Sequence, residues 1–281
     1  MLATFVIGLR EGLEAALIVG IVAAFLARRG QHHALRAMWL GVTAAVALCI
    51  AVGVGLNVLA ANLPHVAQEG LETVVGAVAV GMVTYMVIWM RRNSRGLKHA
   101  LEGAVESALA RGSAAALVAM AFLAVLREGF ETSVFLLAAF QSSTAPLSAG
   151  IGALLGLVVS VTIGYGIYRG GVRLNLSRFF RVTGLVLVLV AAGLVMSSLH
   201  TAFEAGWLTV GQATALDLSW LVRPGSIQAS LVTGVLGWRA QPTVIEVAGW
   251  LVYAIIMTGC LTWPARPSRR PHSVPLPTTG S

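Results

Sequence analysis

Charged residues are scarce in this sequence. Asp, Glu, Lys and Arg make up 11% of the 281 residues, and hydrophobic residues make up 57%. A soluble domain carries about a quarter charged residues. The shortage of charge therefore argues against an ordinary soluble protein and indicates a polytopic membrane protein built from helices.

Cysteine and familiar catalytic motifs are also lacking. Cys49 and Cys260 lie in separate apolar runs without the short spacing of metal-binding pairs, and we interpret them as inert. The chain has no His-Glu-x-x-His, no Gly-x-Ser-x-Gly and no paired-histidine zinc spacing. We therefore expect a protein that is not an enzyme.

Seven apolar segments predict membrane-spanning helices, because each is long enough to cross about 30 Å of hydrocarbon. They cover residues 2–27, 37–60, 70–90, 114–139, 148–168, 181–201 and 245–263. The first lacks a basic n-region and is too long for a signal peptide, so we expect it to be the first span. The predicted fold is all-α, with about seven transmembrane helices in a multi-pass plasma-membrane or bacterial inner-membrane protein.

The basic residues predict the orientation of these spans. Most of the 19 Lys and Arg residues lie in the first, third and fifth connecting loops and in the tail, whereas the second and fourth loops have none. By the positive-inside rule, the N-terminus is outside and the C-terminus is cytoplasmic. The net charge of +8 is then a topology signal, and we expect no nucleic-acid partner.

The predicted organisation is a permease domain over residues 1–265 and a Pro- and Ser-rich tail over 266–281, which we expect to be disordered in the cytoplasm. Residues 91–113 are interpreted as a short amphipathic helix on the cytoplasmic face. The outer loop, residues 202–244, is too long for a turn, and we expect it to lie on the outer surface as partly helical structure.

A hexapeptide recurs after 117 residues: LREGLE at 9–14 and LREGFE at 126–131. Each unit contains three spans, an odd number, so the two copies run in opposite directions. The sequence thus predicts a 3+3 inverted repeat, with one copy in 1–90, the other in 113–201, and a final helix at 245–263. Transporters with inverted repeats bind their substrate at the repeat interface.

Each copy of the motif places two carboxylates and one guanidinium on neighbouring helix positions. Glu11 and Glu14 share a face because they are three residues apart, and Arg10 can pair with Glu14 four residues on. Arg127, Glu128 and Glu131 repeat this arrangement. We also expect Gly12 and Gly129, which lie between the carboxylates, to let the two motif helices approach closely.

The two clusters leave a formal charge of −2 near the middle of the membrane. Each unpaired charge there costs at least ~2.5–3.5 kcal/mol, so compensation is required. A cation with oxygen ligands, held by Glu11, Glu14, Glu128 and Glu131, is the interpretation that we favour. Arg10 and Arg127 would then hold the carboxylates in place. Two alternatives stay open: ion pairs that only lock the bundle, and a proton relay.

Further ionisable residues lie near the outer ends of the predicted spans. We expect them to form an acidic vestibule that collects cations, although each alone is typical of an interfacial side chain. They are Glu69, Glu72, His200, Glu204 and Glu246.

REGLE in the first span and REGFE in the fourth resemble the REXXE signature of the iron permease family, which includes bacterial ferrous iron permeases and fungal high-affinity iron permeases. The similarity extends through "EGLETVVGAVAVGMVTYMVIWM", "HTAFEAG" and "GWRAQPTVIEVAGWLVYA". It implies that Glu11, Glu14, Glu128 and Glu131 bind iron as the transported substrate, Fe²⁺ or Fe³⁺, with Arg10 and Arg127 as the motif arginines. Glu72 and Glu204 match further acidic positions.

The resemblance also implies an extracytoplasmic partner that binds or oxidises iron, and no organic cofactor. Our leading hypothesis is an iron transporter. The residues themselves leave open a carrier of another divalent cation, such as manganese, or a proton-coupled carrier that uses the same glutamates. An intramembrane metalloenzyme is a weaker alternative, because only His200 and Glu204 form a ligand-type pair.

Overall fold

A computed structural model describes residues 1–93, 114–141, 146–169, 175–220, 232–233 and 236–262. Within these residues the fold is helical apart from one isolated bridge between Thr214 and Thr243. The seven helices are α1 Leu2–Arg28, α2 His32–Ala61, α3 His65–Asn93, α5 Ala114–Gln141, α6 Pro146–Tyr168, α7 Leu176–Glu204 and α9 Val244–Thr262. The expected helix within 91–113 and the expected disorder of 266–281 lie outside the described residues, apart from the end of α3.

The seven helices confirm the all-α prediction, and each contains one predicted span. Five of them, α2, α3, α6, α7 and α9, are long and apolar enough to cross a membrane. The other two, α1 and α5, are as long but carry the three charged residues of the REXXE motifs. Charges near the middle of a span are therefore found on the two helices at the centre of the bundle, whereas α3 and α7 carry theirs toward their ends.

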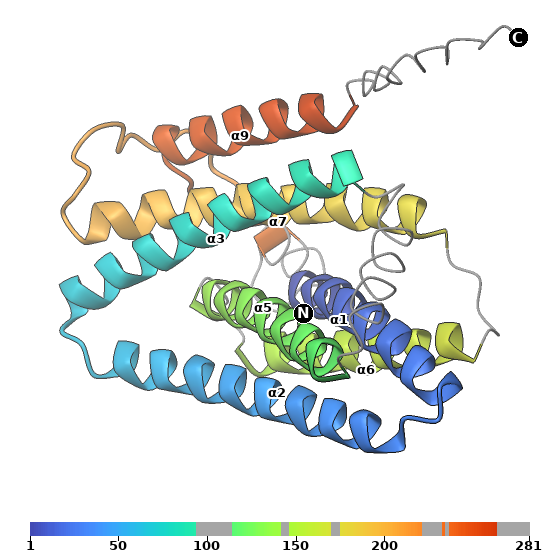
Figure 1. Cartoon of the computed structure of the whole chain (residues 1–281). Helices are drawn as coiled ribbons and strands as arrows, with labels where there is room; N and C mark the ends of the chain where they lie inside the picture. Colours follow the sequence, from blue (N-terminus) through green and yellow to red (C-terminus); the bar gives the residue numbers. More distant parts are fainter. Residues whose placement is uncertain (94–113, 142–145, 170–174, 221–231, 234–235, 263–281) are drawn as a thin grey trace, which may run out of the picture.

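The bundle has a layered arrangement around α1 and α5 (Figure 1). On one side, α6 packs against α1 and α2 packs against α5; on the other lie α3 and α7, with α9 outermost against α7. The contacts pair up as two-fold symmetry would require if α1, α2 and α3 correspond to α5, α6 and α7. Thus the contact between α1 and α6 corresponds to the contact between α5 and α2. The contact between α1 and α7 corresponds to that between α5 and α3.

Glycine sets the tightest of these contacts. Gly8 and Gly12 on α1 face α6, and Gly152 and Gly156 on α6 face α1, so that two small-xxx-small stretches pack closely together. A Cβ added at Gly8 would lie 2.7 Å from the carbonyl oxygen of Ala153, closer than van der Waals contact allows. These positions therefore need glycine.

The motif glycines do not perform the role that we expected from the sequence. Gly12 faces Leu157 and Ser160 of α6, and Gly129 faces the Cys49 side chain of α2. They bring each motif helix close to its supporting helix, and not to the other motif helix. The expectation was wrong because adjacent residues on a helix point about 100° apart, so the glycine and the carboxylates beside it face different neighbours.

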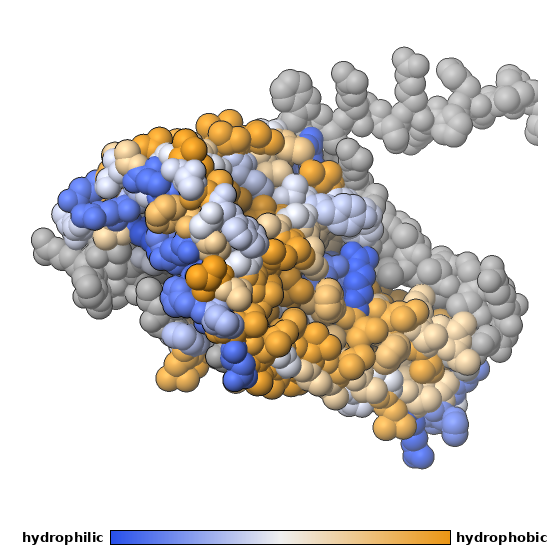
Figure 2. Space-filling view, turned by 90° about the vertical axis from the view of Figure 1, so that its left-hand side faces the viewer, coloured by the Kyte–Doolittle hydropathy of each residue, from blue (hydrophilic) through white to orange (hydrophobic). Residues whose placement is uncertain are grey.

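The described surface is largely apolar. Exposed side chains include Leu40 of α2, Leu147 of α6 and Ile255 of α9, which are 72%, 81% and 68% exposed. Figure 2 views the end of the bundle where α2 and α7 end and α3 and α9 begin. Hydrophobic residues cover much of that view, and hydrophilic ones gather toward one side. Such a surface is stable only in lipid, because soluble monomers rarely expose large apolar patches.

The described part of the outer loop includes helical residues, as we expected, but it is not confined to the outer surface. Two of its stretches pair through their backbones: Ala215 N–H donates to Pro242 O at 2.9 Å and Leu218 N–H to Ala240 O at 2.7 Å. Gly237 then packs directly against Gly193, in the second half of α7. Hydropathy did not predict this inward course, because the segment is too short to stand out as an apolar run.

Candidate metal-binding site

The two motif helices cross in opposite directions. Residues near the start of α1, such as Ile7, share a buried cluster with Phe135 and Ala138 near the end of α5. Leu26 at the end of α1 shares another cluster with Leu117 at the start of α5. This antiparallel crossing places the two REXXE motifs at the same level of the bundle.

Three of the four predicted glutamates converge at the crossing. Glu11, Glu128 and Glu131 each offer one carboxylate oxygen, and the three oxygens lie within 4.8 Å of one another. Glu11 and Glu128 are almost completely buried. Ionised carboxylates this close repel one another, and a shared proton or a cation would relieve that repulsion.

The fourth glutamate, Glu14, is turned toward its own arginine. Its Oε1 atom lies 3.4 Å from Arg10 Nη2, while the other nitrogen Nη1 lies 3.8 Å from Glu11 Oε1. The grouping of three oxygens does not include Glu14. The two motifs are thus unequal, with one converging carboxylate from α1 and two from α5.

The two arginines differ even more. The Arg10 side chain is 1% exposed, whereas that of Arg127 is 53% exposed. Arg127 donates a 2.9 Å hydrogen bond from Nε to Glu131 Oε1. The pairing predicted for each motif is present in both, but only the α1 pair is enclosed by the protein.

The site retains acceptors that no described residue satisfies. Both oxygens of Glu11 and one of Glu128 are buried without a hydrogen-bond partner within the described part of the chain. Three oxygens that lie within 4.8 Å of one another surround a common point at no more than about 2.8 Å, which is 4.8 Å divided by √3. Because an oxygen ligand lies about 2.1 Å from a divalent metal ion, each oxygen needs to move by less than ~1 Å to share it. The donor set, all carboxylate oxygen, suits a divalent cation such as Fe²⁺ or Mn²⁺.

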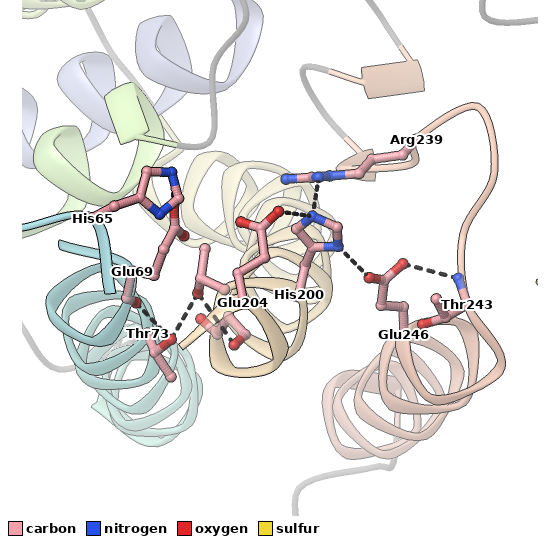
Figure 3. Close-up of polar contacts among 10 residues, drawn as sticks. His65, Glu69, Thr73, His200, Glu204, Arg239, Thr243 and Glu246 are labelled. Carbon is pink, nitrogen blue, oxygen red and sulfur yellow. Dashed lines mark hydrogen bonds and ion pairs between the residues drawn. The ribbon is translucent and has the colours of Figure 1, made fainter. Parts of the chain in front are cut away.

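The residues predicted to form an outer vestibule gather where α3 begins, α7 ends and α9 begins (Figure 3). On α3, Glu69 lies 3.7 Å from His65 and close enough to Glu204 for the two carboxylates to repel each other. On α7, His200 lies 3.2 Å from Glu204 and 2.8 Å from Glu246 of α9. This outer cluster, Glu69, Glu72, His200, Glu204 and Glu246, is therefore one group of side chains in space.

One member of this region was missed by the analysis of the sequence. Arg239 of the outer loop contacts His200 Nε2 through its Nη1 atom (Figure 3). It is also close enough to Glu72 to interact electrostatically. Its only sequence signal was that it is one of two arginines, with Arg223, in a loop on the side of the membrane where basic residues are rare.

A bundle of long apolar helices with buried carboxylates at the crossing of two antiparallel helices is typical of polytopic membrane transport proteins. A family model for the iron permease FTR1 family matches residues 1–264. The chain belongs to this family, which confirms the resemblance noted in its sequence.

Curated relatives named ferrous iron permease EfeU are similar over nearly the whole chain. The protein from Yersinia pestis is 43% identical over 257 residues, 91% of each chain. That from Escherichia coli O6:K15:H31 is 44% identical over 257 residues, 91% of this chain and 93% of its own. The Yersinia pseudotuberculosis protein is 44% identical over 253 residues, 89% and 88% of the two chains. No solved structure matches the chain.

Proposed function

We propose that this inner-membrane permease carries iron into the cytoplasm through the site formed by Glu11, Glu128 and Glu131. Iron transport follows from membership of the iron permease family. The observation that supports the site is the convergence of three carboxylate oxygens from two antiparallel helices. Movement of one three-helix repeat against the other would expose this site alternately to the two sides.

The arginines and Glu14 have different roles in this proposal. Arg10 holds Glu14 and balances part of the negative charge. It takes no ligand position, because a guanidinium has only donors and no acceptor. Arg127 orients Glu131 through the hydrogen bond from Nε. Four glutamates and two arginines then leave two negative charges, which a 2+ ion neutralises.

The outer cluster is proposed as the entrance, with the N-terminus outside and the C-terminus in the cytoplasm. The described arginines at the opposite end of the bundle support this orientation: they include Arg28 at the end of α1, Arg91 near the end of α3 and Arg178 near the start of α7. We infer that an extracytoplasmic protein delivers iron to the cluster. We expect no organic cofactor and no catalytic activity.

Uptake of radioactive ferrous iron into proteoliposomes tests the proposal. Glu11→Gln, Glu128→Gln and Glu131→Gln each remove one charged ligand while keeping the side chain's shape, and we expect each to lose most uptake. Asp217→Asn is the matched control: Asp217 is exposed, and hydrogen bonds from the hydroxyl and amide of Ser219 lower its pKa. Normal uptake by the three glutamine variants would contradict the site.

A proton relay makes a different prediction in the same assay. Glutamine cannot relay a proton, so a relay also loses uptake in the three variants. Binding of the ion to the protein separates the two: a relay retains binding after the substitutions, whereas a ligand site loses it. The expected result is loss of both.

A further inference from the structure

The outer loop enters the bundle at a defined point. A Cβ added at Gly193 would lie 2.9 Å from Gly237 N and 3.0 Å from Gly237 Cα, so the two backbones are in direct contact. Gly193 lies about three helical turns, or about 16 Å, before the end of α7 at Glu204. The loop therefore reaches well below the outer cluster.

Several contacts hold this segment of the outer loop, Leu236–Arg239, against α9. Trp250 of α9 donates from Nε1 to Leu236 O at 2.9 Å, and its ring meets that of Trp238 edge to face at 5.5 Å. Gly237 has φ of +71°, a conformation that favours glycine. The segment is held in a specific conformation.

A chain of hydrogen bonds joins the segment to α7 and α9. Arg239 donates from Nη1 to His200 Nε2, so Nδ1 carries the hydrogen and donates to Glu246 Oε1 at 2.8 Å. Glu246 is 2% exposed and also accepts from Thr243 N–H at 3.0 Å. The buried carboxylate fixes the imidazole, with Nε2 aimed at Arg239 (Figure 3).

The guanidinium occupies a position that suits a metal cation. His200 Nε2 and Glu204 Oε1 lie 3.2 Å apart, and both are acceptors in this tautomer. Two ligands about 2.1 Å from one ion and at right angles to each other lie about 3.0 Å apart. A buried carboxylate that orients the far nitrogen of a histidine is also the usual support of a metal-binding imidazole.

The segment runs along a polar stripe of α7. Gly193, Ser197, His200 and Glu204 recur at helical spacing and share one side of the helix. Gly237 covers the inner end of this stripe and Arg239 contacts it at His200. Val190, one turn further in, shares a buried cluster with Ile7 of α1, which lies one turn from Glu11. The inner end of the stripe therefore lies one turn from the buried cluster that includes Ile7 of the first motif helix.

We propose that Arg239 is a tethered cation that closes the outer end of the iron path. Iron binds His200 and Glu204, displaces Arg239 from His200, and releases the segment Leu236–Arg239 from the polar stripe of α7. This inference rests on the proposed function, because it assigns the entrance of that path. The entering ion takes one imidazole nitrogen and one carboxylate oxygen, a pair that favours Fe²⁺ over Mg²⁺ or Ca²⁺.

Arg239 competes with free cations at His200 and Glu204, and its attachment to the protein makes it an effective competitor. A group attached to the site is present at an effective concentration of about millimolar or more, so weakly bound cations do not displace it. An ion that binds both His200 and Glu204 can displace Arg239. Arg239 would therefore set the affinity for His200 and Glu204 that a metal ion needs in order to enter the path. Removal of Arg239 should let ions of lower affinity enter.

Iron uptake by Arg239→Gln tests the threshold. We expect the apparent KM for ferrous iron to fall about fivefold or more, the lower range of coupling between sites, while Arg239→Lys, which keeps the tethered charge, stays within about twofold of the parent. An unchanged or higher KM in Arg239→Gln, at equal protein in the membrane, would overturn the inference and make Arg239 a structural brace.

Thiol labelling tests the closure separately from transport. In a chain with Cys49→Ala and Cys260→Ala, Ser197→Cys places a thiol on the stripe, and a membrane-impermeant thiol reagent added outside should label it about fivefold faster after Arg239→Gln. Ser198→Cys is the control, because Ser198 faces Gly76 of α3 and its labelling should not change.

Equal labelling of the Ser197→Cys variant with and without Arg239 would refute the closure. The two arms also separate this inference from the proposed function. If the parent protein takes up no iron, the proposed function fails, yet labelling still reports the closure. If Glu128→Gln loses uptake, but Arg239→Gln changes neither the KM nor the labelling of Ser197→Cys, only this inference fails.

Discussion

Gly156 offers a test of the packing that supports the site. An added Cβ there would lie 2.7 Å from Leu9 N, and still closer to the carbonyl oxygen of Phe5, whereas ordinary contact begins at 3.4 Å. Gly156→Ala must therefore move α6 from α1 by at least about 0.7 Å. Both facing groups belong to the backbone of α1 and cannot rotate away, and overpacking of this kind costs about 1–3 kcal/mol.

Thermal unfolding of the purified protein in detergent measures this cost. A loss of 1 kcal/mol lowers the Tm by roughly 2–4 °C for a protein of this size, so Gly156→Ala should lose roughly 2–12 °C. Gly150→Ala is the matched control on the same helix, because no atom lies within 4 Å of a Cβ added there. Its Tm should be equal or slightly higher, since alanine favours the helix.

The same substitution should reduce iron uptake, because displacement of α1 moves Glu11 relative to Glu128. If Gly156→Ala unfolds at the same temperature as Gly150→Ala, α1 and α6 do not pack through glycine. The arrangement that positions Glu11 would then be wrong.

The remaining predictions concern charge at the site. Arg10→Gln should lower stability by about 3–5 kcal/mol, because it leaves buried Glu11 and partly buried Glu14 without their cation. Arg127→Gln should cost about 0–1 kcal/mol, because the Arg127 side chain is half exposed. Denaturation of the two variants compares these losses, and equal losses would contradict the asymmetry. Excess Mn²⁺ should inhibit uptake of Fe²⁺, but with a lower affinity than iron itself, since oxygen ligands bind Mn²⁺ more weakly. Cu⁺ prefers sulfur ligands and should not compete. Strong inhibition of uptake by Cu⁺ would argue against carboxylate ligands.

The sequence predicted the helices well because hydropathy reports directly on burial in lipid. The predicted span 2–27 is observed as Leu2–Arg28, and 114–139 as Ala114–Gln141. The second span was predicted from residue 37, but α2 begins at His32. Hydropathy marks the part of a helix in hydrocarbon, and a helix can continue with polar residues beyond it.

The partners of each helix were less predictable. The duplicated motif indicated that α1 and α5 correspond, yet no pattern showed that Gly12 faces Ser160 of α6. The unequal burial of Arg10 and Arg127 was also hidden, because the two motifs have nearly identical letters. Such differences arise from the surrounding helices, and a local motif does not encode them.

Binding of ferrous iron to the purified protein, followed by X-ray absorption, tests the central claim most directly. We predict that the bound ion has a first shell of oxygen about 2.1 Å away, and that Glu128→Gln and Glu131→Gln abolish binding at that site while Asp217→Asn does not. A shell that contains sulfur, or an unchanged spectrum and affinity in both glutamine variants, would contradict it.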